Sequence, residues 1–219
     1  IDEVYDIDLG VDTNLCGGSL LLDASVGANV NYIWSTGQTD SAIIASVSAI
    51  YTVEIDNNGC KSRDSIVVKV MNVPTALFSS TAACQNKTII FTDSSIYNVT
   101  SWTWDFGDGN FAYIPNPNHS YISPGNYNLS LSIIDTNGCV DTNNTTIVVD
   151  TAFALSMDND TILCQDTLDI SAYGPANANY SWSNSMLGQD ITVDSSGIYV
   201  CIVSRGGCTE EDSIDVTLF

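Results

Sequence analysis

The stretch Trp102-Thr103-Trp104-Asp105-Phe106-Gly107-Asp108-Gly109-Asn110 decides the fold of the residues around it. Its three aromatic residues alternate with Thr103 and Asp105, which is the period-two pattern of a strand with one buried face. Three aromatic side chains on one face bury enough area to centre a small core. Gly107 and Gly109 supply the positive-φ positions of a tight turn, so we expect the strand to end there.

Three further segments follow this turn in an order that is informative about the fold. Asn116 to Tyr121 is followed by Pro124 to Tyr127, and then by an alternating apolar strand around Leu131. In this order the segments resemble the polycystic-kidney-disease (PKD) domain, an immunoglobulin-like β-sandwich of extracellular proteins. The residues that match its motif are Trp104, Asp105, Phe106, Gly107, Asp108, Gly109, His119 and Tyr121.

The two ends of the chain repeat each other. A shift of 148 residues overlays residues 1–72 and 151–219 without a gap and places Cys16, Trp34, Tyr51 and Cys60 on Cys164, Trp182, Tyr199 and Cys208. Self-similarity of this kind indicates two copies of one domain. We therefore predict three domains, at residues 1–72, 73–150 and 151–219.

The repeated domain reads as about seven short strands separated by turn clusters, which is typical of a β-sandwich. Its pattern Leu-Cys, Tyr-x-Trp-Ser, Tyr-Thr-Val, Asn-Gly-Cys and Asp-Ser-Ile resembles the Ig-like repeats of large secreted Bacteroidota proteins. Those proteins include adhesins and gliding-motility surface proteins, often exported by the type IX system. The third domain departs from the first at residues 204–207, where Ser-Arg-Gly-Gly replaces an Asp-Asn-Asn-Gly turn.

The fold class predicted for the whole chain is all-β, with three tandem Ig-like β-sandwich domains in the order Ig-like, PKD, Ig-like. The junctions at residues 71–74 and 149–152 contain no Gly/Ser-rich spacer, so we expect an elongated rod with limited flexing. The chain starts at Ile1 rather than Met, and we interpret it as a piece of a longer protein.

Composition excludes several function classes. The chain has 26 acidic and 5 basic residues and a net charge of −21. Such a balance disfavours nucleic acid and anionic membrane surfaces as partners. No apolar run reaches the length of a transmembrane helix, so we expect no membrane insertion.

The seven cysteines indicate disulfides. None forms a Cys-x-x-Cys pair and His119 is the only histidine, which argues against zinc. Disulfides imply an oxidising compartment, so we expect the protein to be extracellular, either secreted or at the cell surface. The repeat predicts the pairs Cys16–Cys60, Cys164–Cys208 and, by remainder, Cys84–Cys139. A bridge between domains would contradict the three-domain division.

Cys201 is left over and overlays Val53. Two interpretations stay open: a buried, inert thiol in the core, and an exposed thiol that links two chains.

The candidate chemical groups also have structural interpretations. Asp105 and Asp108 resemble a paired-carboxylate or calcium site, but we expect them to accept hydrogen bonds from turn amides. No cofactor is therefore predicted, with calcium as the alternative. His119 and Ser120 point to opposite faces of a strand and cannot act as a base and a nucleophile. We expect His119 to pack near Trp104.

The sequence contains no phosphate loop, Gly-x-Ser-x-Gly or His-x-x-x-His motif, so we predict that the protein is not an enzyme. The aromatic residues of the repeats have two interpretations, as core residues and as a sugar-binding face, and we favour the core for the two tryptophans. These aromatics are Tyr32, Trp34, Tyr180 and Trp182.

Two glycosylation patterns are present. Asp followed by Ser or Thr and an apolar residue resembles the O-glycosylation motif of exported Bacteroidota proteins, and it occurs at Ser41, Ser65, Thr151, Thr161, Thr167 and Ser213. We favour Ser65 and Ser213, which are expected to open the last strand of each copy. Asn-x-Ser/Thr occurs at Asn86, Asn98, Asn118, Asn128, Asn143, Asn144 and Asn159, which would carry N-linked glycans in a eukaryotic secreted protein.

The predicted function is a structural or adhesive segment of a large cell-surface protein, which spaces or presents modules and mediates surface contact. One alternative is an extracellular filament of copies assembled end to end, for which Ile1 to Leu9 would pair with a neighbour's sheet edge. A second alternative is a carbohydrate-binding accessory of a secreted hydrolase. The expected partners are neighbouring domains, copies of the chain, glycans or cell surfaces.

Overall fold

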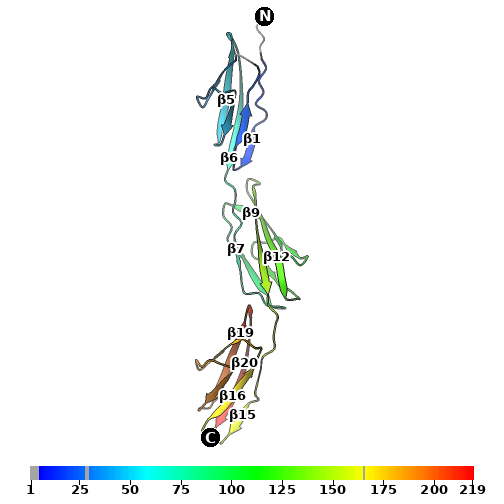
Figure 1. Cartoon of the computed structure of the whole chain (residues 1–219), viewed down its shortest axis with the longest axis vertical. Coiled ribbons are helices and arrows are strands. Elements are labelled where there is room, and N and C mark those ends of the chain that lie inside the picture. Colours follow the sequence, from blue (N-terminus) through cyan, green and yellow to red (C-terminus); the bar gives the residue numbers. More distant parts are fainter. Residues whose placement is uncertain (1–4, 28–29, 165) are drawn as a thin grey trace. The chain divides into compact units, whose positions relative to one another are not determined.

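A computed structural model describes residues 5–27, 30–164 and 166–219, and the elements in these ranges are all strands (Figure 1). Within these ranges no helix is long and apolar enough to cross a membrane. The strands are β1 (Thr13–Cys16), β2 (Leu20–Asp23), β3 (Asn31–Trp34), β4 (Ala42–Ala45), β5 (Ala49–Asn57), β6 (Cys60–Met71), β7 (Phe78–Ser80), β8 (Ile89–Asp93), β9 (Val99–Asp105), β10 (Phe111–Ala112), β11 (Asn118–His119), β12 (Gly125–Asp135), β13 (Val140–Val149), β14 (Ser156–Met157), β15 (Thr161–Leu163), β16 (Leu168–Tyr173), β17 (Asn179–Trp182), β18 (Asp190–Val193), β19 (Gly197–Arg205) and β20 (Cys208–Leu218).

The hydrogen-bonded sheets fall into three consecutive stretches of the chain, which form tandem β-sandwiches. The first sandwich (β1–β6) combines the sheets β1-β6-β5-β3 and β2-β4. The middle sandwich (β7–β13) combines β10-β9-β12-β13 with β11-β8-β7. The third sandwich (β14–β20) combines β15-β20-β19-β17 with β14-β16-β18. The predicted all-β fold class is therefore correct.

Each core is built from side chains that alternate between buried and more exposed positions along the strands. In β5 the side chains of Tyr51, Val53 and Ile55 are buried, whereas the residues between them are half-buried. Leu22 of β2 and Ile43 of β4 enter the same core cluster from the other sheet. Because a strand has a side-chain period of two, one face of each sheet is committed to the core.

The third sandwich repeats the register of the first. β1 runs parallel to β6 and pairs Thr13 with Val68, and β15 runs parallel to β20 and pairs Thr161 with Val216. Each of these four residue numbers differs from its counterpart by the repeat shift of 148. The internal repeat therefore extends from sequence to strand pairing.

The described part of the segment before the first repeat serves its own core, whereas we expected this segment to be free to pair with a neighbour's sheet edge. Ile7 is buried, and Tyr5 and Leu9 pack against the first core cluster, while residues 1–4 lie outside the described residues. The Leu9 N–H also donates to Asp64 Oδ2 at 2.7 Å. Phe153, Leu155 and Met157 pack in the same way on the third core. Residues 5–9 are thus part of the repeat and are not a free edge for a neighbour.

Spatial clustering divides the chain into two compact units, which differ from the three stretches of sheet. The first unit comprises Ile1–Ala76, Ser95–Ser101 and Ser132–Thr142. The second comprises Leu77–Ser94, Trp102–Leu131 and Asn143–Phe219. Their boundary passes through the middle sandwich, so the three predicted domains stay a prediction as independent folding units.

The predicted disulfide pairing is wrong. The structure contains the disulfides Cys16–Cys139 and Cys84–Cys208, whereas Cys60, Cys164 and Cys201 are unpaired. We call the two bonds the junction disulfides, because each joins stretches that the sequence assigns to different domains. The first lies within the first compact unit, and the second within the second unit.

Strand direction explains the error. Cys60 is the first residue of β6, whereas Cys16 pairs with Met71 at the other end of that strand. Eleven residue steps at about 3.3 Å place roughly 36 Å between the two cysteines. A disulfide requires Cα atoms within about 7 Å of each other. Cys16 and Cys60 therefore cannot bond.

The same geometry separates the other two predicted pairs. Cys208 opens β20, and Cys164 follows β15, whose Leu163 pairs with Leu218 at the far end of β20. In the middle sandwich, Cys139 directly precedes β13, whereas Cys84 bridges to Asp150, which directly follows β13. Each sandwich therefore carries one cysteine near each end of its last strand.

Candidate functional site

The turn after β9 is held by its own carboxylates. Asp105 Oδ1 accepts a hydrogen bond from the Gly107 N–H at 2.9 Å, and Asp108 Oδ1 accepts one from the Asn110 N–H at 3.1 Å. Gly107 has a φ of +75°, and a Cβ there would collide with the backbone of Asn128 on β12. The residues of this motif thus fix the turn and its close approach to β12.

His119 packs on a different ring from the one expected. Its imidazole stacks on Phe106, with ring centroids 4.1 Å apart and planes 9° apart, and meets Tyr121 edge-on. Its Nε2 lies 2.8 Å from Asp108 Oδ2, and both side chains are largely covered. The predicted neighbour Trp104 instead contacts Phe91. His119 therefore ties β11 to the turn through Asp108.

Asp108 is stabilised in its ionised form. Burial opposes ionisation, but hydrogen bonds from Asn110 and His119 outweigh it and hold the pKa of the Asp108 carboxyl below its ordinary value. Calcium requires about six to eight oxygen ligands. Asp105 and Asp108 already accept turn amides, and the described residues contain no cluster of three or more potential metal ligands.

A column of aromatic rings forms the middle core. Trp104 is fully buried between Phe78 and Phe91, at centroid distances of 5.1 and 5.6 Å, and its indole N–H donates to the Ile114 carbonyl. Tyr121 is fully buried, donates to the Phe106 carbonyl at 3.0 Å, and has its pKa raised mainly by burial. Such a packed column leaves no aromatic face open for a ligand in this core.

Trp102 is an exception to the predicted burial of the alternating aromatic residues in residues 102–110. It is only half-buried, and its indole N–H donates to Asp93 Oδ2 at 2.8 Å.

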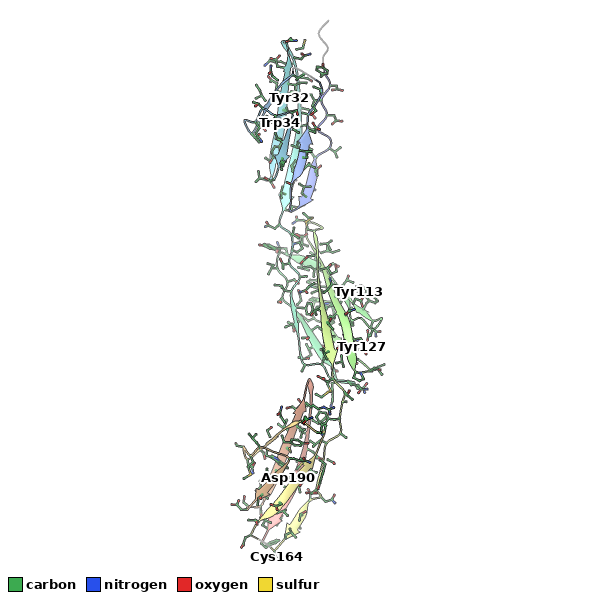
Figure 2. All side chains as sticks on the ribbon, viewed as in Figure 1. Tyr32, Trp34, Tyr113, Tyr127, Cys164 and Asp190 are labelled. Carbon is green, nitrogen blue, oxygen red and sulfur yellow. A yellow bond between two sulfur atoms is a disulfide. The ribbon has the colours of Figure 1, made fainter. Side chains whose placement is uncertain are left out.

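The tryptophans of the two repeats are core residues, as favoured above. Trp34 and Trp182 are 2% and 4% exposed, and their indole N–H groups donate to the carbonyls of Asp40 and Gly188, which are equivalent positions. Tyr32, labelled beside Trp34 in Figure 2, is buried as well. A sugar-binding face built on these tryptophans is therefore excluded.

Asp135 is a buried carboxylate that the sequence analysis missed. It accepts hydrogen bonds from the N–H groups of Asn137 and Cys139, both at 2.8 Å. Burial opposes its ionisation, but these bonds lower the pKa of the Asp135 carboxyl below its ordinary value. The network fixes the turn that presents Cys139 to Cys16. The Asp-x-Asn-Gly-Cys pattern of residues 135–139 was the available signal.

Close backbone contacts surround the second junction disulfide, Cys84–Cys208, and the sequence analysis missed these contacts as well. Asp150 Oδ2 accepts a hydrogen bond from the Gly207 N–H at 2.6 Å. A Cβ at Gly206 would collide with the Asp150 carboxylate, and one at Gly207 would collide with the Ala83 backbone. Cys208 is fully buried. The replacement of the Asp-Asn-Asn-Gly turn at residues 204–207 is thus explained by this approach.

Polar contacts also surround the Cys84–Cys208 disulfide. Lys87 Nζ and Glu210 Oε1 form an ion pair at 2.8 Å, and the Ala152 N–H donates to Gln85 Oε1. The Arg205 guanidinium lies over the ring of Phe153, 5.5 Å from its centroid. The ion pair is partly exposed and contributes little on its own. Together these contacts and the disulfide fix the turn before β20 against residues 83–87 and 150–153.

Cys201 is unpaired and fully buried on β19, and burial raises the pKa of its thiol. This is the position of an inert core thiol, and the interchain alternative lacks an exposed sulfur.

The predicted O-glycosylation residues differ in exposure. Ser65, Thr151, Thr167 and Ser213 are exposed, whereas Ser41 and Thr161 are half-buried. Ser65 and Ser213 do not open their strands, because β6 begins at Cys60 and β20 at Cys208. Thr151 and Thr167 lie outside the strands, where a modifying enzyme has easier access.

A sizeable hollow lies on the surface of the third sandwich. Its volume is about 490 Å³, and it is lined by residues 175–180 and 187–189. No acidic, basic, histidine or cysteine side chain belongs to this lining. The lining includes the half-buried Tyr180, whose hydroxyl donates to the Pro175 carbonyl at 3.3 Å.

Comparison with known proteins identifies the middle sandwich. Residues 72–149 match the family model of the PKD domain. This middle stretch is a PKD domain. The resemblance drawn from the Trp104–Tyr121 motifs is thereby confirmed, and the Asp105 and Asp108 turn bonds described above are contacts of that domain.

Two curated relatives match part of the chain. One is the pre-pro-metalloprotease PrtV of Vibrio cholerae, 41% identical over 58 residues, which are 26% of this chain and 6% of the relative. The other is a microbial collagenase of Vibrio alginolyticus, 41% identical over 51 residues, 23% of this chain and 6% of the relative. The matched region is therefore a small fraction of each relative.

A solved structure supports the tandem sandwich fold. The N-terminal eight Ig domains of Down syndrome cell adhesion molecule superpose with a TM-score of 0.55 and 13% identity, covering 97% of this chain and 36% of that one. At this identity the likeness concerns the fold alone. The Ig-like assignment of the outer sandwiches fits this neighbour.

Proposed function

We propose that this chain is a non-enzymatic, extracellular structural segment of a larger protein, which spaces and presents neighbouring modules and contacts surfaces. The observation that carries the proposal is the pair of junction disulfides, each of which joins consecutive sandwiches covalently. Such bonds limit how far the chain extends when it is pulled. That property suits a segment that transmits force between other domains.

The two disulfides form overlapping loops, because Cys84 lies inside the loop closed by Cys16 and Cys139. The shortest covalent path from end to end therefore runs from Cys16 to Cys139, back to Cys84 and across to Cys208. It contains about 80 residues instead of 219. At roughly 3.5 Å per residue, the unfolded oxidised chain reaches ~28 nm and the reduced chain ~76 nm.

Single-molecule pulling from the two ends tests this mechanical role. We expect the oxidised chain to stop near ~28 nm of contour length and the chain in reductant to reach ~76 nm. The variant Cys84→Ser/Cys208→Ser is the matched control, and its oxidised extension lies between these limits because the loop of Cys16 remains closed. An oxidised wild-type chain that extends to ~76 nm would refute the proposal.

An extracellular location agrees with the disulfides, because such bonds persist in oxidising compartments. The strongly acidic surface keeps such segments soluble and apart from one another. Attachment to glycans or cell surfaces, end-to-end assembly of copies, O-glycosylation and a Bacteroidota origin with type IX export remain parts of this proposal. Intact mass before and after N-glycosidase treatment tests the sugars: a loss of mass contradicts the bacterial assignment.

A second candidate function is that of an accessory module of a secreted hydrolase. It is favoured by the relatives, whose names are those of a metalloprotease and a collagenase. The complete gene decides between the two functions. A zinc-protease His-Glu-x-x-His motif in the same reading frame supports the accessory role, and further sandwich repeats without such a motif support the structural role.

A further inference from the structure

Two of the unpaired cysteines occupy the positions of two bonded ones. The repeat shift of 148 places Cys164 on Cys16 and Cys60 on Cys208. Cys16 and Cys208 form the junction disulfides, whereas Cys60 and Cys164 have no partner within the described residues. Cys201 differs from both, because its equivalent is Val53.

The equivalence holds in three dimensions. Cys60 opens β6 opposite Asn57, and Cys208 opens β20 opposite Arg205, at the same register of the same hairpin. Asn58 and Gly206, one residue further into the two turns, have φ angles of +51° and +58°. Each hairpin thus presents its cysteine in the same way.

The other end of the sandwich repeats as well. Cys16 ends the strand that runs parallel to β6, and Cys164 directly follows the strand that runs parallel to β20. Cys164 is exposed, and Figure 2 shows it at the end of the third sandwich where β15 ends. Its thiol is accessible to another chain segment.

The bonded cysteines show what such a position binds. Cys16 bonds a PKD cysteine, Cys139, that comes later in the chain, and Cys208 bonds a PKD cysteine, Cys84, that comes earlier. Both PKD cysteines of this chain are therefore already used. If Cys60 and Cys164 bond in the way their equivalents do, each needs a free cysteine of another PKD domain at an equivalent position.

We propose that Cys164 forms a disulfide with a further PKD domain that follows the third sandwich in a longer polypeptide, at the position equivalent to Cys139. By the same rule, Cys60 bonds a PKD domain that precedes the first sandwich, at the position equivalent to Cys84. Ig-like and PKD sandwiches would then alternate along one polypeptide, with a disulfide at every junction. This inference does not depend on the mechanical role proposed above.

The bond forms by thiol–disulfide exchange with a disulfide oxidant, such as oxidised glutathione or a thiol oxidoreductase. The two cysteine thiols lose two electrons and two protons and form one S–S bond. The oxidant's S–S bond breaks, and its two sulfurs take up the electrons and protons as thiols. No other reactant is required.

A fusion chain tests the Cys164 half. Residues 72–219 are repeated directly after Phe219, which preserves the spacing because the repeat shift overlays Phe219 on Met71. The chain is refolded in a glutathione redox buffer, alkylated, and mapped by mass spectrometry without reduction. We expect a peptide that joins Cys164 of the first copy to Cys139 of the second, with alkylation of Cys164 at least tenfold lower than in the 219-residue chain.

The control replaces the first copy's Cys164 by Ser, and second-copy Cys139 should then become alkylated. Formation of Cys16–Cys139 and Cys84–Cys208 in the first copy shows that the fusion has folded. Given those bonds, an alkylated Cys164 beside an alkylated second-copy Cys139 would overturn the proposal. A Cys60–Cys164 bond between separate molecules would overturn it equally, because the partner would then be another copy of the chain.

A second fusion tests the Cys60 half. Residues 1–148 are placed ahead of Ile1, so that a PKD domain precedes the first sandwich of the intact chain. We expect Cys84 of the added stretch to bond Cys60. If Cys60 stays fully alkylated in this folded fusion, the proposed bond between Cys60 and a preceding PKD domain is refuted.

Discussion

The two glycines of the PKD turn separate two physical effects that are normally mixed. Gly107 and Gly109 both have positive φ, +75° and +89°. A Cβ at Gly107 would collide with the backbone of Asn128, whereas a Cβ at Gly109 meets nothing within 4 Å. Replacing each by alanine therefore adds the same kind of backbone strain, but only Gly107→Ala adds a collision.

The expected losses of unfolding free energy follow from these contacts. Backbone strain from a positive φ costs about 1–2 kcal/mol for a residue with a Cβ, so Gly109→Ala should lose about that amount. The collision with a strand backbone adds about 1–3 kcal/mol, because β12 must shift to relieve it. Gly107→Ala should therefore lose about 2–5 kcal/mol.

Native-state hydrogen exchange of the β12 amides measures both variants in the region that the turn supports. Equilibrium urea unfolding of the same variants checks the ranking. We expect Gly107→Ala to be the less stable variant by at least ~1 kcal/mol. Equal losses in the two variants would show that the close approach to Asn128 contributes nothing and would refute the reasoning.

Three further predictions concern the core, the turn carboxylate and metal. Trp182→Ala should lose about 3–5 kcal/mol of unfolding free energy, because the Trp182 side chain is 4% exposed. The control Leu187→Ala, whose side chain is 77% exposed, should change the unfolding free energy by no more than ~0.5 kcal/mol. Comparable losses for the two variants in calorimetry would contradict the core assignment of Trp182. The folded-state pKa of Asp108 lies below its ordinary value of 3.8, so the contribution of this carboxylate to stability is present above pH 3.8 and is lost as the pH falls through the lower folded value. In acid titrations followed by circular dichroism, Asp108→Asn should therefore lose less stability than the wild type. Identical acid profiles of the two proteins would contradict this. Chelation with EDTA should leave the melting temperature unchanged, and a steep fall would reveal a metal-dependent fold.

Much of the fold could be predicted from local signals. The alternation of apolar residues located the strands, since a strand with one buried face must repeat every two residues. The Trp104 to Tyr121 motifs located the PKD domain through their resemblance to that family, and the turn within them was predictable because tight turns need glycine and carboxylate residues at fixed offsets. The shift of 148 residues predicted the equivalence of the outer sandwiches, and the strand registers repeat it residue by residue.

The candidate site was predictable only in part. The turn contacts of Asp105 and Asp108 followed from sequence, because Asx turns are local. The stacking of His119 on Phe106 did not, because it depends on how β11 lies against the turn. Asp150 was treated as a linker residue, although its carboxylate accepts the Gly207 amide 57 residues away.

The sequence by itself determined the strands, the PKD turn and the repeat, because each depends on residues close together along the chain or on self-similarity. The tertiary structure alone decided the cysteine pairing. Cys16 and Cys60 belong to one repeat, but parallel pairing of β1 with the far end of β6 separates them by roughly 36 Å. Cys139 is 123 residues from Cys16 in sequence, yet their Cα atoms lie 5.4 Å apart. Disulfides follow distance in space, and strand direction sets that distance.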